Sequence, residues 1–258
     1  MPNYVLNSFI NVSQPNRLKS LITNKEGDID FNVLCPMPEE LGTLDGDVKL
    51  ISKTYYQYAN KAKNVKEYVD LINKELSLNI PHIKDQTELF EMKLSREEDT
   101  RIKSVYATWN YLKYGETGWY DWRKRHWGTK WNACDCSGWE FQTAWCAPGA
   151  WLETLAKKCD FILVFADEDI GSNCGVFVAK DGELKEYYYD WATDESTIFA
   201  CVVQGYDLEE YAEGFDSEEA KESFRKLIKN KDVLLENFFV KIGCKDIYKL
   251  IEKDLKSL

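Results

Sequence analysis

The chain has 258 residues, of which 44% are apolar and 30% charged, and this length can bury the core of one large domain or two small ones. Its formal net charge of −11 excludes duplex DNA binding by charge alone, because phosphate neutralisation needs a broad basic face. It lacks the run of about 20 apolar residues that spans a membrane and the basic and apolar regions of a signal peptide, so we expect an intracellular protein.

Eight cysteines are spread along the chain. A protein of this size without an export signal is expected to keep its thiols reduced and mostly buried. Cys134, Cys136 and Cys146 do not have the spacing of a common zinc site, and His82 and His126 are the only histidines. We therefore predict no metal site and no bound cofactor.

The first elements are expected to follow a β-α-β order. Residues 3–12 roughly alternate apolar and polar side chains, which is typical of a half-buried strand. Pro15 opens a short helix, and residues 28–35 are predicted to form a second strand that Pro36 ends. Residues 45–76 have apolar side chains three and four positions apart and are predicted to be helical.

A long helix is predicted next, followed by a pair of strands. Ser95 and Glu98 have the spacing of a capping box, which starts the helix, and Gly115 is suited to end it. Residues 127–134 and 139–145 are predicted to form paired strands around a turn.

The last part of the chain returns to alternating elements. We predict a helix over 148–158, a buried strand over 161–169, and strands over 175–182 and 184–191 joined by an Asp-Gly turn. Residues 197–203 are predicted to add a strand. Apolar spacing beyond them predicts three helices, around 207–213, 216–240 with a break, and 244–257.

This order, β-α-β, a helical insert and then β-β-α-β-β, predicts an α+β fold with a ferredoxin-like antiparallel sheet. We assign residues 1–205 to a ferredoxin-like domain with a helical insertion at about 43–118. Residues 206–258 are assigned to a helical C-terminal appendage.

Several segments resemble a known family: MPNYVLNSFINVS at the start, FNVLCPMPEEL at 31–41, WGTKWNA at 127–133, FQTAWCAP at 141–148 and FADEDIGSNCGVF at 165–177. They are similar to proteins of bacteriophages, plasmids and integrative elements that carry a YubB-type ferredoxin-like domain. The resemblance covers roughly residues 1–42 and 105–190. It implies a fold and a mobile-element origin, and no established chemistry.

Two departures from that family lie at its motifs. Family members begin with Met-Pro-Asn-Trp-Cys, where this chain has Tyr4 and Val5, and they carry paired prolines where Pro148 stands alone. We interpret both departures as packing substitutions.

Eight of the nine tryptophans fall between Trp109 and Trp151. Strand alternation would place Trp127, Thr129 and Trp131 on one face of the predicted sheet. We interpret Trp127, Trp131 and Trp145 as core or cross-strand side chains.

The basic and aromatic segment 119–126 is the candidate contact surface. On a helix, Trp119, Trp122 and His126 share one face with Arg123 at the flank, and arginine beside indole is a platform for anions or bases. The alternative is a helix whose tryptophans dock on the protein while its cations stay solvated. The predicted binding residues are Trp119, Trp122, Arg123, Lys124, Arg125, His126 and Lys130.

Asp167, Glu168 and Asp169 end a predicted central strand, where carboxylates can bind a divalent metal or act as acid and base. Nothing else in the sequence completes a catalytic set, and acidic residues at a turn are ordinary. We therefore predict no catalytic residue.

The leading hypothesis is a non-enzymatic accessory protein of a phage or mobile element. It would act in the cytoplasm of a bacterial host and bind a host macromolecule. We expect this partner to be a host protein, and a role against a defence system follows from the mobile-element origin. Binding of single-stranded nucleic acid or a nucleotide through the Trp/Arg platform is the first alternative. A metal-dependent hydrolase using the carboxylates at 167–169 is the second.

Overall fold

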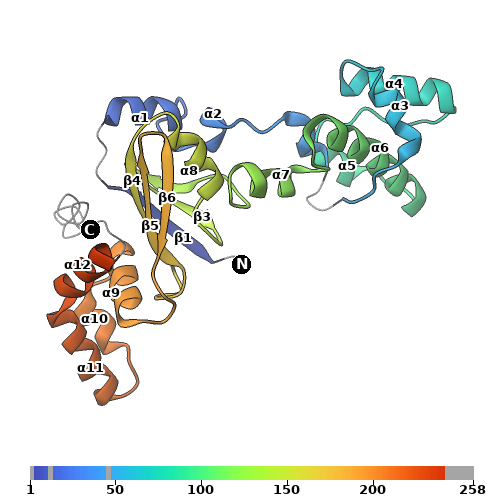
Figure 1. Ribbon diagram of the computed structural model, residues 1–258. Helices are drawn as coiled ribbons and strands as arrows, with labels where there is room; N and C mark the ends of the chain where they lie inside the picture. The colour runs from blue at the N-terminus through green and yellow to red at the C-terminus, as the bar shows by residue number, and fades with distance from the viewer. Residues whose placement is uncertain (1–2, 11–13, 45–47, 242–258) are drawn as a thin grey trace. The chain divides into compact units, whose positions relative to one another are not determined.

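The computed structural model describes residues 3–10, 14–44 and 48–241, and the chain forms two compact units (Figure 1). The sheet unit takes Met1–Cys35 and Trp127–Leu258, and the helical unit takes Pro36–His126. Within the described ranges, no helix combines the length and the apolar character needed to cross a membrane.

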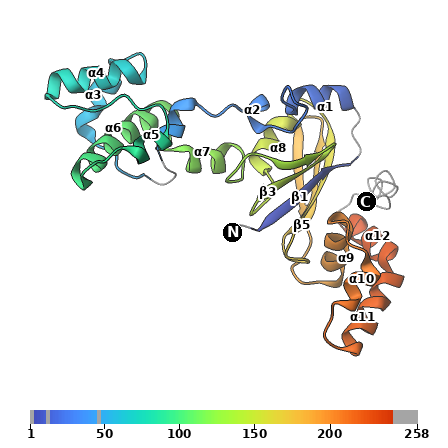
Figure 2. The same ribbon diagram turned by 180° about the vertical axis from the view of Figure 1, so that it is seen from behind.

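The sheet unit contains a six-stranded antiparallel sheet with the order β2-β3-β1-β4-β5-β6. Strand β1 lies between β3 and β4 (Figure 1 and Figure 2). The strands are β1 Tyr4–Phe9, β2 Cys134–Ser137, β3 Glu140–Ala144, β4 Phe161–Asp167, β5 Cys174–Lys180 and β6 Glu183–Tyr188.

Two helices complete the ferredoxin-like arrangement. Helix α1 (Pro15–Ile22) follows β1, and α8 (Gly149–Ala156) connects β3 to β4. The chain order β-α-β-β-α-β with the sheet order β2-β3-β1-β4 is that of a ferredoxin-like fold. The β5–β6 hairpin extends the sheet beyond β4. The predicted fold class is confirmed.

One face of the sheet carries an aromatic core. Phe9 lies 5.9 Å from Phe141 and 5.3 Å from Phe161 between ring centroids. Phe31 lies 4.7 Å from Trp151 of α8 and 5.9 Å from Phe141. These large, closely spaced rings remove much apolar area from water and fix α8 on this face.

The C-terminal helices cover the opposite face. Alternate residues of β4 (Ile162, Val164 and Ala166) share a buried cluster with helix α9 (Asp194–Val203) and with the helices that follow it. The tail up to residue 241 is therefore part of the sheet unit, and the helix predicted at 244–257 lies outside the described residues. The helices are α10 Leu208–Glu213, α11 Glu218–Lys229 and α12 Lys231–Lys241.

The prediction of a strand over 28–35 is wrong. Residues Phe31–Leu34 form the short helix α2, whose first turn is capped by the Asp30 carboxylate accepting the Asn32 N–H. The Phe31 N–H donates to Asn132 Oδ1 at 2.8 Å. Strand β2 therefore provides the second strand of the fold, after the helical unit rather than before it.

The prediction of a strand over 127–134 is also wrong. Gly128 has φ +86°, and a Cβ atom there would lie 2.9 Å from the Gly149 backbone nitrogen, so this segment is a tight loop against the start of α8. The Thr129 hydroxyl donates to the Ala144 carbonyl at 2.8 Å. Strand β2 forms in the segment that the sequence assigned to a turn.

The prediction of a strand over 197–203 is wrong as well, because these residues belong to helix α9. Thr193 and Ser196 form a reciprocal capping box at its start. Isoleucine and valine favour strands, but here Ile198 and Val203 are buried among the helices and β4. Tertiary packing decides between helix and strand at this position.

The helical unit confirms the long predicted helix. Ser95 and Glu98 form the capping box of α6, which ends at Gly115 with φ +80°. Between α6 and α4, the Tyr68 hydroxyl donates to the Val105 carbonyl at 3.0 Å. The elements are η1 Glu39–Thr43, η2 Lys53–Tyr55, α3 Tyr56–Ala59, α4 Val65–Leu76, α5 Gln86–Glu91, α6 Arg96–Tyr114 and α7 Trp119–His126.

A Gly175→Ala substitution is expected to destabilise the sheet unit. A Cβ atom at Gly175 would lie 2.2 Å from the Tyr187 carbonyl oxygen and 3.1 Å from the Phe165 ring. Overpacking of this kind lowers the free energy of unfolding by about 1–3 kcal/mol. Thermal unfolding measures it, with Gly42→Ala as control, since nothing lies within 4 Å of a Cβ there. Equal unfolding temperatures for the two variants would contradict the packing described here.

Candidate functional site

Trp122 and His126, two of the predicted binding residues, are neighbours on α7. The Trp122 indole is buried, and its ring stacks on His126 with centroids 4.4 Å apart and an interplanar angle of 26°. Burial, and then the nearby Arg125 charge, lower the pKa of His126. Trp122 therefore offers no open indole face to a ligand.

Trp119 lies beside Arg123 on the same helix. The Arg123 guanidinium carbon lies 4.8 Å from the Trp119 ring centroid, and its Nε–H donates to Met37 Sδ at 3.3 Å. Burial lowers the pKa of Arg123. The predicted pairing of arginine with indole is present, but within the protein's own packing.

The remaining cations of α7 also have local contacts. The Lys124 ammonium lies 5.2 Å from the Tyr120 ring centroid. The Arg125 guanidinium pairs with Glu116 at 2.7 Å.

Lys130 belongs to the sheet unit, where its ammonium lies 4.7 Å from the Trp131 ring centroid. The seven predicted binding residues are therefore divided between two units. Ligand binding by them remains a prediction.

The carboxylates at 167–169 point to different partners. Asp167 is buried and accepts hydrogen bonds from Asn3 Nδ2 at 3.2 Å and from the Asp169 N–H at 2.9 Å. Glu168 instead accepts the Tyr4 N–H at 3.1 Å. Burial raises the pKa of Asp167. In the parts of the chain that are described, no three His, Cys, Asp or Glu side chains gather as metal ligands.

Four of the described cysteines, Cys134, Cys136, Cys174 and Cys201, have thiols that are hard to ionise. No disulfide joins the seven cysteines within the described ranges. Burial raises the pKa of Cys134 and of Cys136, and raises those of Cys174 and Cys201 to about 12. A thiol must be ionised to act as a nucleophile or metal ligand, so these four are poorly suited to either role.

Trp145 lies where the sequence did not predict it. We expected a buried cross-strand residue, but its side chain is 57% exposed and its backbone has φ +75°. Non-glycine residues rarely adopt this conformation. The Trp145 N–H donates to the Asn3 carbonyl at 2.9 Å, and its carbonyl accepts from Asn173 Nδ2 at 3.2 Å.

Asp167 bonds to both asparagines that hold Trp145. Its carboxylate accepts from Asn3 Nδ2 at 3.2 Å, and its backbone N–H donates to the Asn173 carbonyl at 2.9 Å. An exposed indole on a backbone fixed from both sides is preorganised for contact, because little conformational entropy is lost when a partner covers it.

Two further exposed aromatic side chains belong to the same end of the sheet. Tyr188 is 54% exposed, lies near Cys146, and sets its ring 5.4 Å from the buried Phe165. Trp191 follows it in a turn and is 76% exposed. Trp145, Tyr188 and Trp191 are called the aromatic end below.

Antiparallel register explains why the aromatic end forms. Ala144 pairs with Tyr4, Asp167 with Val5, and Tyr188 with Gly175, so these strand termini meet at one end of the sheet. Trp191 stands among Asp and Thr in a polar turn, and this was the one signal in the sequence for an exposed aromatic residue.

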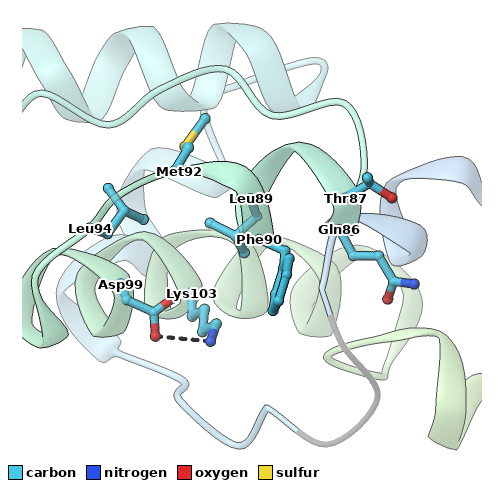
Figure 3. A pocket seen from close by; sticks show the side chains of 8 residues that line it. All are labelled: Gln86, Thr87, Leu89, Phe90, Met92, Leu94, Asp99 and Lys103. Atoms are coloured by element: carbon cyan, nitrogen blue, oxygen red, sulfur yellow. Dashed lines mark hydrogen bonds and ion pairs between the residues drawn. The ribbon is translucent and has the colours of Figure 1, made fainter.

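The helical unit contains a separate hollow of about 420 Å³ (Figure 3). Leu89, Met92 and Leu94 line it together with Phe90, which is 90% exposed. Its charged side chains, Asp99 and Lys103, pair with each other at 2.9 Å. This hollow can hold an apolar group, and its charged lining side chains are already paired.

Comparison with known proteins places a domain within the sheet unit. Residues 126–223 match the family model described as the ferredoxin-like domain in Api92-like protein. The chain contains a ferredoxin-like domain. The matched segment covers β2 to β6 and continues into α11. No curated protein and no solved structure matches the chain.

Replacing Trp145 is expected to separate backbone strain from side-chain loss. Trp145→Gly and Trp145→Ala both remove the exposed indole, but only glycine adopts φ +75° without a steric penalty. We expect the free energy of unfolding of the glycine variant to be about 1 kcal/mol higher than that of the alanine variant. Chemical denaturation measures this difference, and a less stable glycine variant would contradict the fixed backbone.

Asp167→Asn is expected to change how stability depends on pH. Because burial raises the pKa of Asp167 in the folded state, the folded protein binds this proton more tightly, and stability falls as pH rises through that pKa. The asparagine variant lacks this loss, so its stability relative to the native protein should increase from pH about 4 to about 7. Any lost hydrogen bond costs the same at each pH. A difference in denaturation midpoint between the variant and the native protein that stays the same at every pH would contradict the raised pKa of Asp167.

Proposed function

We propose that this protein is a non-enzymatic accessory protein of a bacteriophage or another mobile element. It acts in the cytoplasm of the bacterial host and binds a host protein, which we place among defence components. The resemblance to YubB-type proteins of mobile elements supports the origin. The binding role is supported by the geometry of the sheet unit.

The observation that carries the proposal is the fixed and exposed Trp145. Tryptophan and tyrosine are enriched among the residues that dominate protein interfaces. A large aromatic side chain that is both exposed and held in an uncommon backbone conformation is costly unless it serves a contact. Trp191 and Tyr188 add exposed aromatic area at the same end of the sheet.

The contacts of the alternative sites give the other functions less support. A platform for nucleic acid requires open aromatic faces, whereas Trp122 is buried and Trp119 lies against Arg123. A metal-dependent hydrolase requires converging carboxylates. Asp167 and Glu168 instead accept hydrogen bonds from Asn3 and Tyr4, and no group of three metal-ligand side chains forms among the described residues.

Affinity capture from a bacterial host lysate tests the proposal. The full chain is expected to recover a stoichiometric protein partner, and Trp145→Gly is expected to weaken this capture about tenfold, as for a central interface residue. Phe90→Ala is the control, because Phe90 is an exposed aromatic residue of the helical unit. Recovery of no partner, or a partner that Trp145→Gly retains fully, would contradict the proposed function.

A further inference from the structure

Two acidic segments, 167–173 and 189–195, lie at the end of the sheet that carries the aromatic end. Glu168 and Asp169 are exposed in the loop between β4 and β5, and Asp190 and Asp194 are exposed after β6. Neither segment 167–173 nor segment 189–195 contains a lysine or an arginine. Backbone bonding joins the two segments, since the Ala192 N–H donates to the Gly171 carbonyl at 3.0 Å.

A lysine of α12 reaches this acidic surface. The Lys241 ammonium lies 3.2 Å from Asp190 Oδ2, and both side chains are about three-quarters exposed, at 74% and 77%. An ion pair this exposed is weak and screened by salt. A cation from a binding partner can therefore replace Lys241 at little cost.

Aromatic faces and carboxylates attract the same kind of ligand. A cation over an indole ring is stabilised by the ring quadrupole, and arginine does this more often than lysine because its planar guanidinium stacks. Carboxylates around the ring then meet the remaining charge. The same surface repels phosphates, which disfavours nucleic acid here.

We infer that the aromatic end binds a cationic, arginine-rich segment of the partner protein. Guanidinium groups of that segment lie on the rings of Trp145 and Trp191, while Glu168, Asp169 and Asp190 meet their charge. This inference rests on the proposed function, because it names the chemistry of the partner that the aromatic end contacts.

Fluorescence anisotropy with labelled peptides and the full chain tests the inference. Three short peptides alternate serine with arginine, with lysine or with glutamate, and each is titrated at low and high ionic strength. The arginine peptide should bind more tightly than the lysine peptide, and the glutamate peptide should not bind. The affinity of the arginine peptide should fall as the salt concentration increases.

Variants of the full chain locate the bound peptide. Trp191→Ala and Trp145→Gly should each weaken the arginine peptide by roughly three- to tenfold. The combined Glu168→Gln and Asp169→Asn variant should weaken it and flatten the salt dependence. Phe90→Ala should leave the affinity unchanged. Trp191 lies in an exposed turn, so Trp191→Ala keeps the test valid if position 145 proves important for folding.

Three results would overturn the inference. The first is that the arginine peptide does not bind, or that both tryptophan variants bind it as tightly as the native protein does. Another is equal binding of the glutamate peptide. The third is a single-stranded oligonucleotide that competes for the same tryptophans. A captured host partner that depends on Trp145 but is not displaced by the arginine peptide would refute this inference and leave the proposed function standing.

Discussion

The position of β1 in the centre of the sheet constrains the whole chain. Its neighbours β3 and β4 come much later in the sequence: Asn7 donates to Thr143 Oγ1, 136 residues further on, at 2.9 Å. The helical unit intervenes, so the chain must leave and re-enter the sheet unit at neighbouring points. The buried Trp127 indole joins these two points by donating to the Cys35 carbonyl at 2.9 Å. Because the two ends of the insertion are held together locally, the domain accommodates a large insertion before its second strand.

The same central strand assembles the surface to which we assign function. Antiparallel pairing brings the start of β1, the end of β3 and the end of β4 together. Asp167 then bonds to Asn3 through its carboxylate and to Asn173 through its backbone N–H. Loops fixed on a rigid sheet commonly carry binding residues. The exposure of Trp145 is therefore a consequence of the fold's register rather than of its local sequence.

Local signals predicted some of this structure well. The Ser95 capping box and the Asp-Gly hairpin depend on neighbouring residues alone, and both are present. The stacking of Trp122 on His126 follows the predicted helical spacing. Which side of that helix is buried depends on distant segments, so the sequence offered Trp122 as a binding residue although it is buried. Trp145 was missed for the same reason, since alternation along a strand does not reveal where the strand ends.

Fluorine NMR of the full chain labelled with fluorotryptophan tests the central claim directly, because each of the nine indoles reports on its own surroundings. Single substitutions assign the resonances, and the arginine peptide or a captured partner is then added. We predict that the resonances of Trp145 and Trp191 shift while that of Trp119 does not. A shift confined to Trp119, with Trp145 and Trp191 unchanged, would contradict the assignment of function to the aromatic end.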